Sequence, residues 1–217
     1  MKTPIQAKTA AASPRVERRR VRTREALMNA AQQLLSARPA EAVNVDEIAE
    51  LADVAKGTFY NYFADKDALV REVEGAARAE IEQRIAQTNA GIDNSPERVA
   101  RAFATMLNWA LEDPTKARTL LRMTPHFADP DAPSNSGVRR DVHAGVADGS
   151  FTGITDEAGV VLVLSVLTGG VNRALDLVHK EKVRGVGENL AEALLVALGH
   201  ERSDAAAIAA RAMTLVG

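Results

Sequence analysis

The segment that most constrains the fold spans residues 45–69. It contains two short amphipathic stretches separated by a tight turn at Asp53, and a new helix start follows the second stretch. Asn44 stands directly before the first stretch, and Glu47 follows three residues later, which is a capping-box pattern that predicts a helix N-terminus. Two short helices joined by a tight turn are typical of a helix-turn-helix, which we place at about 45–64.

The second of these helices, expected over 56–62, is unusually rich in aromatic residues. The chain has only five Phe, two Tyr and one Trp, yet four of these aromatics lie within residues 59–63. Val54, Phe59 and Phe63 can face inward against the neighbouring helices. Two half-buried structural tyrosines would be the alternative explanation, but the concentration of aromatics argues against it.

The outward-facing side chains of this segment suit double-stranded DNA. Lysine and asparagine donate to base edges or phosphates, tyrosine hydroxyls suit phosphates, and glycine lets the backbone approach the duplex. A lysine beside the N-terminal amides of the next helix predicts a phosphate anchor. The candidate DNA-binding residues are Asn44, Lys56, Gly57, Thr58, Tyr60, Asn61, Tyr62 and Lys66.

Composition places the chain among ordinary soluble proteins. Its 217 residues are 46% apolar and 26% charged, which is typical of a globular protein with a sizeable core. The absence of cysteine excludes disulfides and thiolate metal sites and fits a reducing cytoplasm. The N-terminus lacks a signal-peptide core, and the longest apolar stretch, 160–167, is too short to cross a bilayer. We therefore expect a cytoplasmic protein that does not use a membrane.

The net charge of −2 hides a strongly basic N-terminus. Residues 1–24 contain eight basic residues and one acidic residue. We expect a disordered basic arm over residues 1–20, because this part lacks an apolar period. Such an arm is a candidate phosphate-binding element, and a flexible tail without DNA contact is the alternative.

The whole chain is predicted to be all-α, because no segment shows the period-two alternation of a strand. We expect a helix-turn-helix DNA-binding domain at 21–69 and a helical domain at 70–217. The expected helices span 22–37, 44–52, 56–62, 65–88, 96–112, 114–127, 136–148, 155–180, 184–199 and 203–215.

Residues 24–73 resemble the N-terminal domain of the tetracycline-repressor (TetR/AcrR) family. The resemblance implies a three-helix DNA-binding domain followed by a helical domain that binds a small-molecule effector and dimerises. It covers about 50 of the 217 residues. It depends on the apolar helix 26–35, on Val45-Asp46-Glu47-Ile48-Ala49, on Val54-Ala55-Lys56-Gly57-Thr58-Phe59-Tyr60-Asn61-Tyr62-Phe63, and on Lys66 and Leu69.

Two residues depart from the pattern of this family. Asp53 stands where the family usually has glycine, in a turn that takes positive φ. Asp and Asn are the better-tolerated substitutes there, so we predict a left-handed Asp53 and an intact turn. Pro39 replaces a frequent glycine after the first helix, and we expect only a reshaped loop.

The C-terminal half is expected to hold an effector pocket and a dimer surface. The helices at 155–180 and 184–199 are apolar enough to form a four-helix interface with a second copy, and a monomer core is the alternative. The candidate pocket residues are Phe103, Met106, Trp109, Met123, His126, Phe127 and Asn172, each of which could instead be an ordinary core residue.

The resulting functional hypothesis is a dimeric, sequence-specific transcriptional regulator, a repressor released from a palindromic operator by a small molecule. The alternatives are an activator and an architectural DNA-binding protein that senses nothing. We do not expect an enzyme, because the chain has no Gly-rich phosphate loop and no Gly-x-Ser-x-Gly elbow. No cofactor is expected, and the grouping of His126, Asp129 and Asp131 is only a weak metal candidate.

Overall fold

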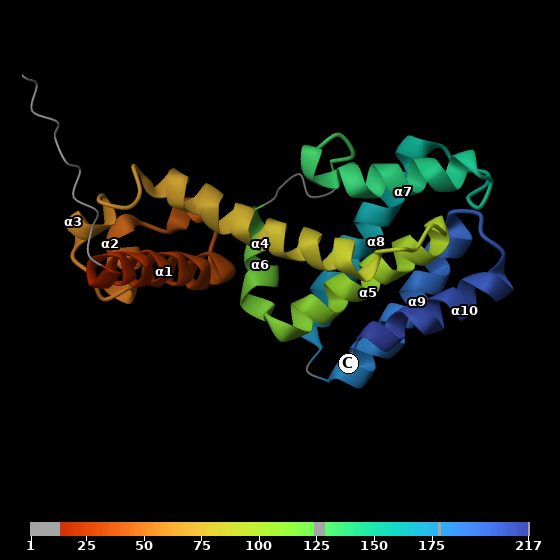
Figure 1. The fold of residues 1–217 in the computed structure, drawn as a ribbon. Helices are drawn as coiled ribbons and strands as arrows, with labels where there is room; N and C mark the ends of the chain where they lie inside the picture. The colour runs from red at the N-terminus through yellow and green to blue at the C-terminus, as the bar shows by residue number, and fades with distance from the viewer. Residues whose placement is uncertain (1–13, 124–128, 178, 217) are drawn as a thin grey trace, which may run out of the picture.

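The computed structural model describes residues 14–123, 129–177 and 179–216, and all regular structure within these ranges is helical. The expected all-α class is therefore confirmed. Figure 1 shows an elongated molecule with α1 to α3 at one end, α5 and α7 to α10 at the other, and α4 and α6 between them. The helices are α1 (Pro14–Ala37), α2 (Val45–Leu51), α3 (Lys56–Phe59), α4 (Lys66–Thr88), α5 (Ser95–Glu112), α6 (Pro114–Met123), α7 (Ser136–Ala147), α8 (Asp156–Asp176), α9 (Lys180–Ala197) and α10 (Arg202–Ala212), with short 3₁₀ turns η1 (Ala40–Ala42), η2 (Pro133–Asn135) and η3 (Met213–Leu215).

The N-terminal unit has its own hydrophobic core. Buried apolar side chains of α1, α2, α3, the first turns of α4 and the segments that connect them form one cluster. Its last member on α4 is Val73, so this core extends one turn beyond the boundary expected at residue 69. The buried members are Leu27, Ala30, Ala31, Leu35, Val43, Ile48, Phe59, Phe63, Leu69 and Val73.

The C-terminal unit is built around α5. Phe103 and Trp109 of this helix are almost fully buried, and α5 packs against α4, α7, α8, α9 and α10. Two glycines allow this close packing, because an added Cβ at Gly170 would meet the Phe103 ring at 2.6 Å and one at Gly187 would meet Leu107 at 2.6 Å. Bulkier residues there would push α8 and α9 away from α5.

Helix α8 corrects the expectation that no segment is long and apolar enough for a bilayer. Within the described ranges it is the one helix that meets that test, with 21 residues and a mean hydropathy of 1.6 over an 18-residue window. The sequence-based expectation considered only the apolar run at 160–167. The helix continues beyond this run through glycine, threonine and alanine, which also have no charge. Val163, Leu164 and Leu167 face the core, so packing inside a helical domain accounts for the apolar character of α8.

Two helices join the units. Helix α4 runs without interruption from the N-terminal core into the C-terminal core (Figure 1). Helix α6 belongs to the C-terminal half by sequence but packs along α1, where the Thr119 hydroxyl donates to the carbonyl oxygen of Gln32 at 3.0 Å. Near the end of α6, Met123 packs against the N-terminal core.

Two predicted spans in the N-terminal half differ from the structure. Helix α1 begins at Pro14, so residues 14–20 are helical and not part of a disordered arm, because arginine is a good helix former and extends the helix. Helix α3 ends at Phe59, after which backbone bonds such as Tyr62 N–H to the Phe59 carbonyl (2.9 Å) form i→i+3 turns. Residues 1–13 of the arm and 124–127 of the predicted sixth helix lie outside the described residues.

Candidate functional site

The start of α2 forms the predicted capping box. Asn44 Oδ1 accepts from the backbone N–H of Glu47 at 3.0 Å, and Glu47 Oε2 accepts from the backbone N–H of Asn44 at 3.1 Å. Arg38, just after the end of α1, donates to Glu47 Oε1 at 3.0 Å. The Asn44 backbone amide and then Arg38 lower the pKa of Glu47. Asn44 is thus a cap residue whose exposed side chain is already engaged.

The turn between α2 and α3 adopts the predicted left-handed conformation. Asp53 has φ = 53° and is the one non-glycine residue with positive φ in the described ranges. The turn is closed by the backbone N–H of Val54, which donates to the carbonyl oxygen of Ala49 at 3.0 Å. The prediction of an intact turn despite the missing glycine is therefore confirmed.

Helix α3 buries one ring and exposes several polar groups. Phe59 is fully buried, and the Phe63 ring lies 5.7 Å from it, so these two rings anchor the segment in the core. Tyr60 is 53% exposed, and Asn61 is also exposed. Gly57 has no heavy atom within 4 Å of where a Cβ would stand. The segment therefore presents an exposed surface with hydrogen-bond donors around α3.

Thr58 and Tyr62 lie at the edges of this surface. Both are only partly exposed, and Tyr62 packs against the N-terminal core. The Tyr62 side chain is therefore held by packing, which limits its contacts to those its hydroxyl can reach.

Lys56 is exposed and oriented by a carboxylate. Its Nζ lies 2.9 Å from Asp46 in the first turn of α2, and this contact raises the pKa of Lys56. The lysine therefore stays charged at neutral pH and points from the start of α3 toward the start of α2. A phosphate or base edge that binds Lys56 has to compete with Asp46.

Lys66, predicted to form a phosphate anchor with the first amides of the next helix, also bonds inside the domain. Its Nζ donates to the carbonyl oxygen of Ala40 at 2.8 Å and to that of Val43 at 3.0 Å. The side chain is partly buried and satisfies two carbonyls of the loop after α1. Since two of the three ammonium protons are used inside the domain, Lys66 mainly ties the start of α4 to this loop.

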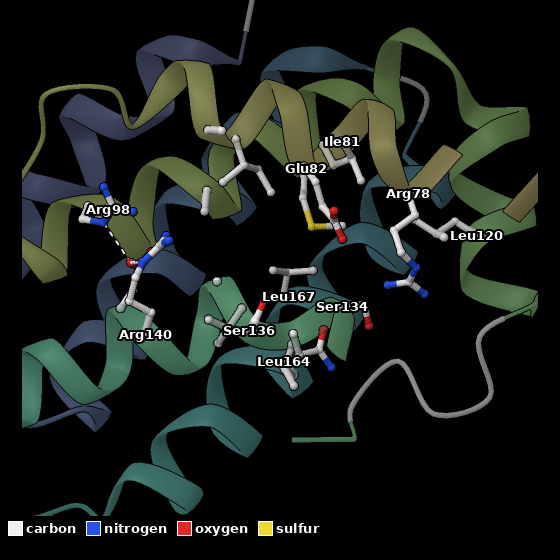
Figure 2. A pocket seen from close by; sticks show the side chains of 18 residues that line it. Arg78, Ile81, Glu82, Arg98, Leu120, Ser134, Ser136, Arg140, Leu164 and Leu167 are labelled. Atoms are coloured by element: carbon white, nitrogen blue, oxygen red, sulfur yellow. Dashed lines mark hydrogen bonds and ion pairs between the residues drawn. The ribbon is translucent and has the colours of Figure 1, made fainter. Parts of the chain in front are cut away.

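A cavity of about 280 Å³ lies between α4, α5, α6, α7 and α8 (Figure 2). At least half of its lining residues are apolar, and charged side chains lie at both ends and between them. The lining residues are Arg78, Ile81, Glu82, Ile85, Ala86, Arg98, Ala102, Met106, Leu120, Ser134, Asn135, Ser136, Gly137, Val138, Arg140, Asp141, Leu164 and Leu167.

The two ends of the cavity carry different charged groups. Figure 2 shows Arg78 next to Leu120 at one end and Arg98 next to Arg140 at the other. Arg98 Nε lies 2.9 Å from Asp141 Oδ1, so a buried carboxylate balances this guanidinium. Glu82 projects between the two ends. The cavity thus suits a small, largely apolar molecule with polar groups at its edges.

Of the predicted pocket residues that the structure describes, only Met106 lines this cavity. Phe103 is buried core, and Trp109 is buried with its indole N–H donated to Glu80 Oε1 at 3.1 Å. Met123 packs on the N-terminal core, and Asn172 lies exposed on α8, bonded to the Thr168 carbonyl at 3.0 Å. His126 and Phe127 lie outside the described residues. The described part of the chain contains no group of three His or acidic residues that could hold a metal.

Sequence reasoning missed most of the lining because no local pattern marks it. Arg98 and Asp141 are 43 residues apart in the chain, and the cavity exists only where five helices fail to close completely. The one signal in the sequence that could have indicated the cavity was the presence of arginines on the amphipathic helices α4 and α5.

The N-terminal domain contains a helix-turn-helix whose α3 region exposes polar side chains. Helix α4 joins it to a helical domain that has its own cavity. This combination defines the class of DNA-binding regulators with a separate ligand domain. Residues 27–73 match the family model of bacterial regulatory proteins of the tetR family. Residues 94–211 match that of the tetracyclin repressor-like C-terminal domain. The chain belongs to the TetR family of transcription regulators, and members of this family are regulators and not enzymes.

Solved structures agree with this assignment. RolR in complex with resorcinol is 25% identical, with 90% of this chain and 96% of that chain covered and a TM-score of 0.59. A γ-butyrolactone receptor (ArpA-like protein) is 20% identical, covers 89% and 98%, and has a TM-score of 0.67. A TetR family transcription regulator from Marinobacter aquaeolei VT8 is 18% identical, covers 77% and 92%, and has a TM-score of 0.63. No curated protein matches the chain in sequence.

Proposed function

We propose that this regulator is a repressor that binds a palindromic operator as a homodimer and is released by a small molecule in the cavity. The observation that carries the proposal is that α4 lines the cavity with Arg78, Ile81, Glu82 and Ile85 and begins directly after the α3 surface. Occupation of the cavity therefore acts on the same helix that supports the DNA-reading segment.

The exposed surface around α3 supports recognition of the major groove. Lys56, Tyr60 and Asn61 are exposed together, and the open backbone at Gly57 permits close approach. We assign base reading to Lys56 and Asn61, because lysine suits guanine and asparagine suits adenine. Asn44, Thr58, Tyr60 and Tyr62 are assigned to the flanking phosphates.

The outer faces of α8 and α9 support dimerisation. On α8, Val161, Ser165 and Gly169 recur every four residues and are all exposed, and Val161 is 41% exposed although it is apolar. On α9, small exposed residues recur in the same way, namely Gly185, Asn189, Ala193 and Ala197. Two smooth adjacent helical faces fit a four-helix interface with a second copy.

A dimer places two α3 segments on successive major grooves, about 34–36 Å apart. A ligand changes DNA affinity only by its differential affinity for the DNA-bound and free conformations. We propose that the occupied cavity favours a conformation with a different α3 separation, transmitted by α4 and α6. The presence of the cavity supports a sensing regulator over an architectural protein, which has no need of one.

The test is selection of bound sequences from a random duplex pool at moderate salt, followed by displacement with resorcinol as the first probe. An enriched palindrome confirms the two-fold regulator, and release of the operator by resorcinol or by a related hydroxyaromatic compound confirms ligand control. Salt-sensitive binding without enrichment contradicts the proposal and favours the architectural alternative.

The matched variants are Asn61→Ala, which alters the selected sequence, and Leu164→Trp, which fills the cavity. The second variant keeps operator binding and loses the response to the probe. If Leu164→Trp responds as the wild type does, the assignment of the cavity is wrong.

A further inference from the structure

The first nine residues of α1 contribute no side chain to the core of the N-terminal domain. The helix begins at Pro14, yet its first buried side chain is Leu27. All residues from Pro14 to Arg22 are exposed. This part of α1 therefore extends about nine residues, or roughly 13 Å at 1.5 Å per residue, without a buried side chain.

Four arginines share one face of this projecting helix. Arg15, Arg18, Arg19 and Arg22 follow the spacing i, i+3, i+4, i+7, which places them within about 100° of one another around the axis. We call these four residues the arginine stripe. Arg20 and Arg24 point away from it, by the same geometry. Within the described part of the chain, no member of the stripe has an ion pair or side-chain hydrogen bond.

Nothing in the part of the chain that the structure describes accounts for this arrangement. Like charges at i, i+4 destabilise a helix, and cations near a helix N-terminus oppose the helix dipole. Glu17 is the one acidic residue between Pro14 and Arg24. Because the stripe is costly for the free helix, it is better explained by an anionic partner outside the chain.

The stripe lies at the DNA-reading end of the molecule. Arg24 forms an ion pair with Glu72 and lies over the Phe63 ring, 5.3 Å from its centroid, so this part of α1 is held beside the segment that follows α3. From Arg24 the helix continues toward its N-terminus by about 13 Å to Arg15. Figure 1 shows this N-terminal end of α1 at the same end of the molecule as α2 and α3.

We propose that the arginine stripe binds the sugar–phosphate backbone of the duplex that flanks the half-site read by α3; this rests on the proposed function. The stripe spans about 10 Å, and a duplex carries one negative charge per roughly 1.7 Å of axis. Several phosphates therefore lie within reach of the four guanidinium groups. The stripe adds affinity and length of footprint without reading sequence, since phosphates carry no base identity.

The test is the salt dependence of DNA binding by the full chain in which the four stripe arginines are replaced by glutamine. Glutamine keeps the helix propensity and removes the charge. Each lost phosphate contact lowers the slope of log K against log salt by about 0.9, so up to eight contacts in a dimer give a reduction of about 4–7. Affinity for the selected operator and for an unrelated duplex of equal length should fall by a similar factor, on the order of 100-fold or more at 0.1 M salt.

Three controls make the result specific. The quadruple Arg→Lys variant should keep the wild-type slope within about 1, because the charge is retained. Arg20→Gln, one position off the stripe, should change the slope by less than about 1. On an operator duplex trimmed to the edges of the half-sites, the wild type and the glutamine variant should bind alike, since the flanking phosphates are absent.

A quadruple glutamine variant with the wild-type slope on long duplexes overturns the proposal. So does a difference that persists on the trimmed duplex, because the stripe then contacts DNA inside the half-sites. If selection yields no operator but the glutamine variant still loses slope on unrelated DNA, the stripe is confirmed and the sequence-specific regulator is the part that fails.

Discussion

The contact that most clearly ties α4 to the C-terminal domain is centred on Glu80. Its carboxylate accepts from the indole N–H of Trp109 on α5 at 3.1 Å, from Lys116 on α6 at 2.9 Å, and from Arg84 at 3.0 Å. Three helices therefore meet at one side chain. Replacing Glu80 by alanine removes all three contacts at once and leaves the buried indole N–H without its partner.

The expected loss follows from these contacts. An orphaned buried donor costs about 1–3 kcal/mol, and the partly exposed ion pair with Lys116 adds on the order of 1 kcal/mol. We expect Glu80→Ala to lower the free energy of unfolding by about 3 kcal/mol, which corresponds to a Tm lower by roughly 6–12 °C for a chain of this size. Glu80→Gln keeps an acceptor for Trp109 and should cost only about 1 kcal/mol.

The assay is urea unfolding followed by the fluorescence of Trp109, which is the single tryptophan of the chain. Because the indole is buried, its emission reports directly on the contact between α4 and α5. The control is Glu188→Ala on α9, which removes a carboxylate that takes no part in this contact. A Glu80→Ala variant within 0.5 kcal/mol of the wild type (a loss far below the roughly 1 kcal/mol of a single hydrogen bond) would refute the reasoning.

The pH dependence of this contact has a defined sign. The hydrogen bond from Lys116 lowers the pKa of Glu80. The carboxylate therefore stabilises the folded state above its unfolded-state pKa, and this contribution is lost as pH falls through the lower, folded-state pKa. The stability difference between the wild type and Glu80→Gln should thus be constant near neutrality and shrink below about pH 4. A difference that grows on acidification would contradict this assignment.

Three further substitutions test other parts of the structure by thermal or urea unfolding. Asp53→Val should lower stability by about 2 kcal/mol because φ is positive there, whereas Asp53→Gly should leave it equal or higher; equal losses for both would exclude a left-handed turn. Lys66→Met should lower stability by about 2 kcal/mol, because two carbonyl oxygens lose their hydrogen-bond donor. It should change the salt slope of DNA binding by less than about 1. A large change in slope with full stability would instead support the role of Lys66 as a phosphate anchor. Gly199→Ala should cost about 3 kcal/mol, since its Cβ would stand 2.0 Å from the Thr152 carbonyl oxygen and φ is +85°; a stable variant would show that this loop can move.

Local rules predicted much of the N-terminal domain from sequence. The capping box of Asn44 and Glu47 spans three residues, and the left-handed Asp53 depends only on its own backbone, so each could be inferred without knowing the fold. The inward positions of Phe59 and Phe63 followed from helical spacing in the same way. These features are decided by interactions between near neighbours in the chain.

The features that sequence did not predict depend on distant partners. Lys66 was expected to face phosphate, but the carbonyls that it meets belong to residues 23 and 26 positions earlier. Trp109 looked like a pocket residue because it is large and apolar, yet its N–H is taken by Glu80, 29 residues away. The cavity lining is the sum of many such long-range placements, so no periodicity in the chain marks it.

The position of α6 has a consequence for how this regulator can change its ligand over time. On this ten-residue helix, Leu120 forms part of the cavity wall, while Thr119 bonds to α1 and Met123 packs on the N-terminal core. A substitution on α6 that admits a new ligand therefore also disturbs the packing of the DNA-binding domain. Another part of the lining, from Ser134 to Val138, does not belong to the N-terminal core as far as the structure describes it. Substitutions that adapt the cavity to a new ligand should therefore accumulate in that part of the lining. Substitutions on α6 should occur only together with substitutions in its partners on α1.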